Sequence, residues 1–130
     1  MTVHEMLQQV ALLSTGDYAR DGDISSIEIP TPGGRRQVIL GKVDQIMDED
    51  IAVLYTTVGK VNECVDLHYL LALNTSLRHS RTALLNGDEV VLVATFDLIN
   101  TSVKECARVL QELAAVADDL ERRWYSADIS

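Results

Sequence analysis

Apolar residues recur at helical spacing near each end of the chain, and each of these segments begins with a capping pattern. Thr2 and Glu5 form a capping box, so we predict a helix over residues 3–14 that ends at Thr15-Gly16. Ser102 and Glu105 form a second capping box, ahead of apolar positions at alternating steps of three and four: Val103, Cys106, Leu110, Leu113, Ala117, Leu120 and Trp124. This pattern predicts a closing helix of about 22 residues, roughly 33 Å long, whose wide apolar face packs across a sheet.

Five strands are predicted between these helices, from runs of β-branched and aliphatic residues bounded by turn signals. The first three, at about residues 24–30, 37–43 and 51–58, form a meander whose first turn is Pro30-Thr31-Pro32-Gly33-Gly34. The last two, at residues 81–85 and 89–96, flank Asn86-Gly87, a dipeptide that favours a type I′ hairpin turn. A short helix over about residues 63–75, capped by Asn62, separates the two groups, and the polar residues 16–23 are expected to form a loop.

The predicted order of elements is α-β-β-β-α-β-β-α in a single domain that spans residues 1–130. It indicates an α+β fold, in which an antiparallel sheet carries helices mainly on one face. Residues 51–55 and 90–94 are continuously apolar, whereas a strand with one wet face should alternate. Both faces are therefore expected to be covered, by a second copy of the chain, by a client protein, or by helices wrapped around a coiled sheet. We expect a homodimer.

The second half of the chain carries a family resemblance. Leu71-Ala72-Leu73-Asn74 closes the short helix, Glu89-Val90-Val91-Leu92 lies in the hairpin, and the segment from Leu113 to Ala117-Asp118 lies in the closing helix. With the order of elements, these segments resemble the YbjN family of the type III secretion chaperone-like fold, over about residues 64–124, while residues 1–60 match in element order alone. The resemblance implies a small and usually dimeric chaperone or regulator that acts by binding other proteins.

Charge and composition narrow the classes of partner. The chain has 11 lysines and arginines against 20 aspartates and glutamates, a net charge of −9. This balance argues against binding to nucleic acid or to an anionic membrane surface. No apolar run approaches the ~18 residues of a membrane helix, and the N-terminus lacks a signal-peptide pattern. The two cysteines suit a reducing compartment, so a cytoplasmic location is expected.

Two patterns have the spacing of metal ligands. Asp17, Asp21 and Glu28 fall at ligand positions of an EF-hand loop, but Ala19 brings no oxygen and the prolines after Ile29 prevent an exiting helix. Cys64 and His68 are four residues apart on the predicted short helix, a spacing that suits two zinc ligands or a nucleophile and its base. The alternatives are a solvated acidic loop, and a buried thiol beside a partly buried histidine. Cys106, on the apolar seam of the closing helix, is expected to be inert.

Charged groups elsewhere suggest surface pairing. The basic segments Arg78-His79-Ser80-Arg81 and Arg35-Arg36 are interpreted as turn-adjacent solvated charge, although an anion site is conceivable there. Asp118 and Asp119 each precede an arginine by four residues, the favourable order for pairing on a helix surface. Leu113 is expected to be buried, so that Leu113→Ala costs roughly 2–5 kcal/mol. Glu112 is placed on the outer face, where Glu112→Ala should cost less than ~0.5 kcal/mol.

The sequence contains no recognisable set of a nucleophile, a general base and a residue that orients the base, and no set of four metal ligands. We therefore expect no catalytic turnover and no required cofactor. The leading hypothesis is a non-enzymatic protein-binding module, a chaperone-like or regulatory adaptor that acts as a homodimer. It would bury an apolar segment of a partner protein against the first helix and the first two strands, at Val3, Met6, Leu7, Val10, Ile27, Ile29, Val38 and Leu40. The competing hypothesis is a small-ligand or metal-binding domain that uses the 17–28 segment for calcium, or Cys64 and His68 for zinc.

Overall fold

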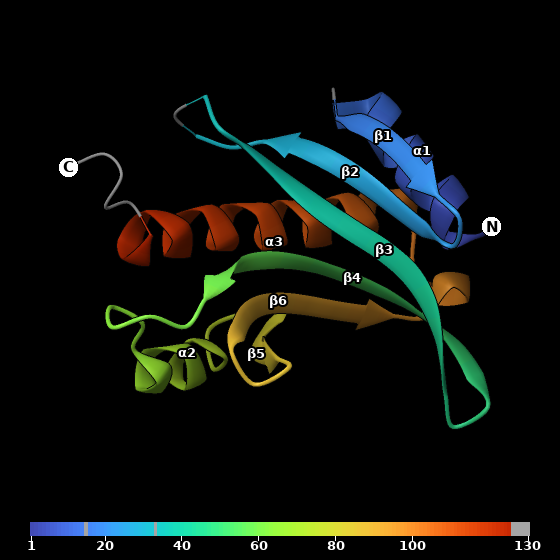
Figure 1. Ribbon diagram of the computed structural model, residues 1–130. Coiled ribbons are helices and arrows are strands. Elements are labelled where there is room, and N and C mark those ends of the chain that lie inside the picture. Colours follow the sequence, from blue (N-terminus) through green and yellow to red (C-terminus); the bar gives the residue numbers. More distant parts are fainter. Residues whose placement is uncertain (15, 33, 126–130) are drawn as a thin grey trace.

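The computed structural model describes residues 1–14, 16–32 and 34–125, which form one six-stranded antiparallel sheet and three α-helices (Figure 1). The strands lie in the order β1-β2-β3-β4-β6-β5. The elements are α1 (Val3–Ser14), β1 (Asp17–Asp21), β2 (Ile24–Pro30), β3 (Arg36–Ile46), β4 (Glu49–Lys60), α2 (Leu67–Leu73), β5 (Arg81–Leu85), β6 (Glu89–Phe96), the 3-10 turn η1 (Leu98–Asn100) and α3 (Val103–Trp124). The predicted α+β class and antiparallel sheet are confirmed.

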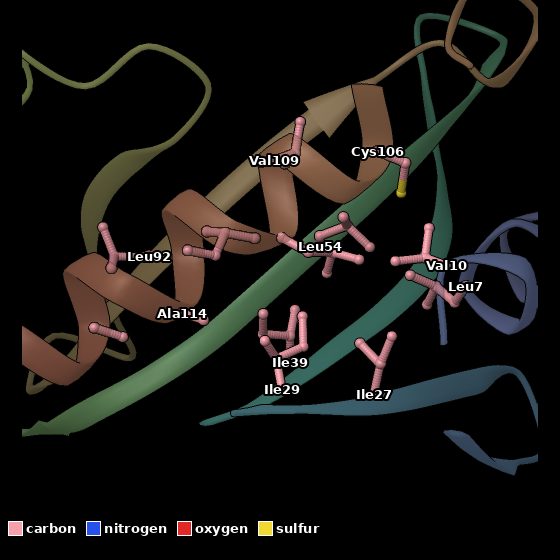
Figure 2. Close-up of a cluster of buried hydrophobic side chains, with 14 of the residues drawn as sticks. Leu7, Val10, Ile27, Ile29, Ile39, Leu54, Leu92, Cys106, Val109 and Ala114 are labelled. Atoms are coloured by element: carbon pink, nitrogen blue, oxygen red, sulfur yellow. The ribbon is translucent and has the colours of Figure 1, made fainter. Parts of the chain in front are cut away.

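The helices pack on one face of the sheet and enclose the hydrophobic core (Figure 1). Leu7 and Val10 of α1 meet Ile27 of β2, while α3 lays its apolar stripe along the middle of the sheet (Figure 2). Gly41 of β3 makes the close approach of α1 possible, because a Cβ there would lie 2.6 Å from a methyl carbon of Leu7. No helix in the described part of the chain is long and apolar enough to cross a membrane.

The capping box predicted at Thr2 and Glu5 is complete, and the one predicted at Ser102 and Glu105 is present in its hydroxyl half. The Thr2 hydroxyl accepts a hydrogen bond from the Glu5 amide at 3.1 Å, and the Glu5 carboxylate accepts one from the Thr2 amide at 3.2 Å. At the start of α3, the Ser102 hydroxyl accepts from the Glu105 amide at 3.0 Å. The predicted limits of α1, at residues 3–14, and of β5 and β6 are confirmed. Thr15 and Gly33, which belong to the predicted helix end and first turn, lie outside the described residues.

Two local predictions are wrong. The segment expected to be a loop contains β1, an edge strand that pairs with β2 from Asp17–Glu28 to Asp21–Ile24. It escaped the pattern analysis because an edge strand has little apolar burial to mark it. The short helix begins at Leu67, not near residue 63, because Asp66 caps it by accepting from the Tyr69 amide. Asn62 instead accepts from the Cys64 amide, in a turn before the helix.

The continuous apolar runs of β4 and β6 have an explanation within one chain. Val53 and Val91 point away from the helices, yet they are only 8% and 3% exposed. They lie among Tyr55, Leu85 and the aliphatic stem of Lys42, which line the same shallow hollow. Neighbouring side chains on the twisted sheet therefore cover them, and the runs do not by themselves require a second copy.

Candidate partner-binding surface

The face of the sheet that no helix of the described residues covers, here called the open face, has an apolar row across its centre. Strand register places Leu40 of β3 beside Tyr55 of β4, and Tyr55 beside Val93 of β6. Leu40, Tyr55 and Val93 are all half-buried. Val38 and Leu85 extend the apolar surface on either side and are 49% and 42% exposed. An apolar group of a partner would therefore find hydrophobic contacts across β3, β4, β6 and β5.

The open face is hollowed between β3 and β5. A cavity of about 190 Å³ has an apolar floor of Val53, Val91 and Val93. At its rim the Lys42 ammonium lies 5.9 Å from the centre of the Tyr55 ring and 3.5 Å from the Asp44 carboxylate. This hollow is large enough for one apolar side chain and has both charge signs at its edge.

Charged side chains cover the other end of the open face, over β1 to β3. Arg36 lies 3.3 Å from the Asp17 carboxylate and 3.2 Å from the Glu28 carboxylate. Asp17 and Glu28 are thus partners in the β1–β2 ladder, and both pair with the Arg36 guanidinium instead of forming a metal site. The 17–28 segment is a β-hairpin with Gly22 at its turn, and it is followed by β3 where a calcium loop has an exiting helix. Among the described residues, no cluster of three metal-ligating side chains occurs.

β3 and β4 diverge at one end, and the opening between them is here called the β3–β4 wedge. Their register runs from Ile46–Glu49 to Leu40–Tyr55 and stops, although β3 continues back to Arg36 and β4 forward to Lys60. Figure 1 shows the two strands separating toward the last turns of α3. A cavity of about 350 Å³ occupies the wedge, lined by Arg36, Gln37, Val38, Leu40, Thr56, Thr57 and Glu121.

Side chains bridge the wedge where the backbone ladder is missing. Thr56 donates through its hydroxyl to the Val38 carbonyl at 2.7 Å, and Gln37 donates through its amide nitrogen Nε2 to the Thr56 hydroxyl at 2.8 Å. Gln37 Nε2 also lies 3.2 Å from the Glu121 carboxylate, so α3 closes the inner side of the wedge. Burial and the nearby Asp118 charge raise the pKa of Glu121 above its ordinary value, although the Gln37 hydrogen bond opposes this.

The structure separates the eight predicted partner-binding residues into two groups. Six of them, Val3, Met6, Leu7, Val10, Ile27 and Ile29, are at most 7% exposed and form the core between α1 and the sheet. They are not available to a partner while the chain is folded. Val38 and Leu40 point to the open face and also line the wedge. The spacing of apolar residues in the sequence identified positions that face the core. It contained no signal that distinguishes residues buried in the core from residues that face a partner.

The hypothesis that Cys64 and His68 share one helix face, as zinc ligands or as a nucleophile and its base, is not supported, because Cys64 lies before the helix. Cys64 is exposed in the turn before α2, and His68 is exposed in the first turn of that helix. The expected buried thiol and partly buried histidine are therefore also wrong at these positions. Cys106 is buried in the core, as predicted, and burial raises the pKa of its thiol to about 12. At that value the nucleophilic thiolate is scarce at neutral pH, which agrees with an inert side chain.

The basic segment before β5 binds an anion, and that anion is a carboxylate of the same chain. The backbone amides of Arg78, His79 and Ser80 donate to Glu112 at 2.8–2.9 Å, and the Ser80 hydroxyl donates at 2.6 Å. Burial would raise the pKa of Glu112, but these hydrogen bonds outweigh it and the pKa is lowered. The placement of Glu112 as an inert outer-face residue is wrong, because a helical pattern does not show which loop lies opposite.

Asp118 has a second structural role besides its predicted pairing. Arg35, in the loop before β3, donates to both Asp118 oxygens at 2.7 and 3.0 Å, and the Asp118 side chain is only 3% exposed. Arg122 lies 3.4 Å away, so the predicted pair with this arginine is also present. The hydrogen bond from Arg35 lowers the pKa of Asp118 below its ordinary value. The Arg35-Arg36 segment is thus an anchor to α3 and to β1–β2, although both side chains remain partly exposed to solvent.

A polar cluster that sequence reasoning missed joins α1 to the first hairpin. The Ser25 hydroxyl is hydrogen-bonded to the His4 ring and, at 2.8 Å, to the Tyr18 hydroxyl. Burial lowers the pKa of His4, and nearby Arg20 adds to this effect. Ser25 is fully buried, so no substrate reaches its hydroxyl in the folded chain. The cluster therefore links α1 to the β1–β2 hairpin by hydrogen bonds.

Comparison with known proteins gives structural relatives. No protein-family model and no curated protein sequence matches the chain. The Yersinia pestis type III secretion chaperone SycH, solved with a stable fragment of YscM2, is 18% identical with a TM-score of 0.60, over 94% of this chain and 99% of that one. YbjN from E. coli, described as a proposed transcription regulator, is 12% identical with a TM-score of 0.52, over 99% of this chain and 96% of that one. The chain therefore has the YbjN/type III secretion chaperone-like fold that the sequence resemblance predicted.

Proposed function

We propose that the chain is a non-enzymatic protein-binding module, a chaperone-like or regulatory adaptor, that receives an apolar segment of a partner on its open face. The observation that carries the proposal is the apolar row of Leu40, Tyr55 and Val93, flanked by exposed Val38 and Leu85. Apolar patches of this kind on a protein surface mark interaction sites. The relative SycH, of the same fold, was solved with a fragment of another protein, which supports the proposal.

The net charge of −9 favours protein partners over nucleic acid or anionic membranes, and we place this action in the cytoplasm. A random peptide library displayed on phage tests the proposal, with the purified chain as bait. Peptides should be enriched, and they should lose most of their affinity for the Val38→Asp/Leu85→Asp variant. Ile99→Asp is the matched control, because Ile99 is 91% exposed in η1 and lies outside the open face. Absence of enriched peptides, or equal binding to both variants, would contradict the proposal.

We further infer that the chain acts as a homodimer, and α2 offers the surface for a second copy. Leu67 and Leu71 are four residues apart on the outer side of this helix and are 45% and 70% exposed. A twofold contact would bring the same leucines of both copies together, which removes apolar area from water.

Light scattering should give a mass near twice the 14.4 kDa of one chain. Leu71→Glu should convert the dimer to monomer, whereas Leu12→Glu should not, although Leu12 is 86% exposed. A wild-type mass of one chain at micromolar concentration would rule out the dimer and leave partner binding standing by itself.

A further inference from the structure

The β3–β4 wedge has the features of a site for an extended chain. Each of its strands is already paired on its other side, β3 with β2 through Gln37–Ile29 and β4 with β6 through Thr56–Leu92. Within the wedge the Val38 carbonyl points toward β4, where it accepts from Thr56. The amide and carbonyl of one strand residue point to the same edge, so the Val38 amide faces the wedge as well. A segment laid along this edge of β3 would find the Val38 amide as a backbone donor, and the Val38 carbonyl has a second lone pair beside the one that accepts from Thr56.

The inner side of the wedge carries a carboxylate that is held by a neutral group. Arg35 and Arg36, the nearest arginines of the loop and β3, are paired with other acids: Arg35 with Asp118, Arg36 with Asp17 and Glu28. Glu121 receives its hydrogen bond from the uncharged amide of Gln37, and Arg35, which pairs with Asp118, adds a Coulombic attraction to it without a hydrogen bond. A cation that enters the wedge would gain a charge-assisted hydrogen bond with Glu121 in a partly desolvated place. The net charge of −9 adds a long-range attraction for basic segments.

We propose that the β3–β4 wedge receives an extended segment of a partner protein that carries a lysine or arginine, whose side chain pairs with Glu121. The inference rests on the proposed protein-binding function and specifies which part of the partner is recognised. Val38 and Leu40 belong both to the wedge and to the open face, so one segment contacts both. Its apolar residues lie on the open face, and its basic residue points inward. A second copy of this chain is not the occupant we propose, because its inferred contact is Leu67 and Leu71 of α2, which do not line the wedge.

The peptides enriched on the wild-type chain provide the test. We expect them to share a lysine or arginine flanked by β-branched or apolar residues, and to bind Glu121→Gln at least about tenfold more weakly, as expected for loss of one charged hydrogen bond. Asp119→Asn is the matched control, since it makes the same change in net charge two residues away on the exposed side of α3. Thr57→Lys, at an exposed wedge position of β4, places a cation inside the wedge and should abolish binding. Circular dichroism checks that each variant is folded.

The outcomes separate the two proposals. If no peptide is enriched, the protein-binding function itself is wrong. If peptides are enriched but bind Glu121→Gln and Asp119→Asn with equal affinity, or share no basic residue, the open face binds partners and the wedge inference is overturned. If binding falls with Val38→Asp/Leu85→Asp, Glu121→Gln and Thr57→Lys but not with Asp119→Asn, and the Val38 amide resonance shifts when the peptide is added, both proposals hold.

Discussion

Helix α3 holds the molecule together by two different surfaces, an apolar stripe and a set of carboxylates on its flanks. The stripe, centred on Leu113, is fully buried against the sheet. The carboxylate of Glu112 reaches the loop before the edge strand β5, and that of Asp118 reaches the loop before the interior strand β3. The stripe can be read from periodicity along the helix, whereas the carboxylates depend on which loops fold back onto it. One surface supplies most of the stability, and the other fixes where the connecting segments lie.

The largest expected effect is on the apolar stripe. Leu113→Ala removes three carbons from a fully buried position and leaves a cavity, at a cost of roughly 2–5 kcal/mol in the free energy of unfolding. Urea denaturation measures this cost. Arg108→Ala, at an exposed position of the same helix, is the control and should change stability by less than ~0.5 kcal/mol. Equal costs for the two variants would mean that the buried face of α3 is wrongly assigned.

Replacing a carboxylate of α3 should lower the free energy of unfolding by less than Leu113→Ala, but by clearly more than a surface substitution. Glu112→Ala leaves the amides of Arg78, His79 and Ser80 without their acceptor, and we expect a loss of about 1–3 kcal/mol. Glu112→Gln keeps one acceptor oxygen and should lose less. Hydrogen exchange of these three amides should accelerate in the alanine variant. A cost no larger than that of Arg108→Ala would show that the loop before β5 does not depend on Glu112.

A pH titration sharpens the comparison, because the two surfaces respond differently to acid. Arg35 lowers the pKa of Asp118 below its ordinary value of 3.8, so the folded state binds this proton more weakly than the unfolded state. Its stabilising contribution is complete above 3.8 and is lost as the pH falls through the lowered pKa. The stability difference between wild type and Asp118→Asn should therefore shrink below pH 3.8. The deficit of Leu113→Ala should persist there, since no ionisable group is changed.

The smallest expected effect lies at the turn between β3 and β4, away from α3. Met47 and Asp48 both have positive φ, at 52° and 66°, a conformation that L-residues other than Asn, Asp and Gly adopt at a cost. Replacing the pair by Asn-Gly, as in the natural turn at Asn86-Gly87, should stabilise the chain by roughly 0.5–1 kcal/mol. Met47 is 93% exposed, so no packing is lost. A decrease in the melting temperature would contradict this.

The sequence predicted those parts of the fold that are held by near neighbours in the chain. The capping residues Thr2 and Ser102 and the Asn86-Gly87 turn depend on contacts within a few residues, and the apolar steps of α3 follow the helical repeat. Such contacts appear as spacing, and spacing can be read directly. The same pattern also placed Ile27 and Ile29 among partner residues, because burial against α1 and burial against a partner give one and the same apolar alternation.

Tertiary structure decided the rest, because the deciding contacts join residues far apart in the chain. Asp118 finds Arg35 across 83 positions, Glu112 finds Ser80 across 32, and Glu121 finds Gln37 across 84. Each of these side chains alone is typical of a solvated helix surface. The end of the β3–β4 ladder likewise lies where Gln37 of β3 meets Thr56 of β4 and Glu121 of α3. The edge strand β1 was missed for another reason, because its polar residues pair locally with β2 and have little apolar burial. The sequence thus determined most of the elements and their core faces, while the packing of distant segments determined which polar groups became anchors and which surface remained open.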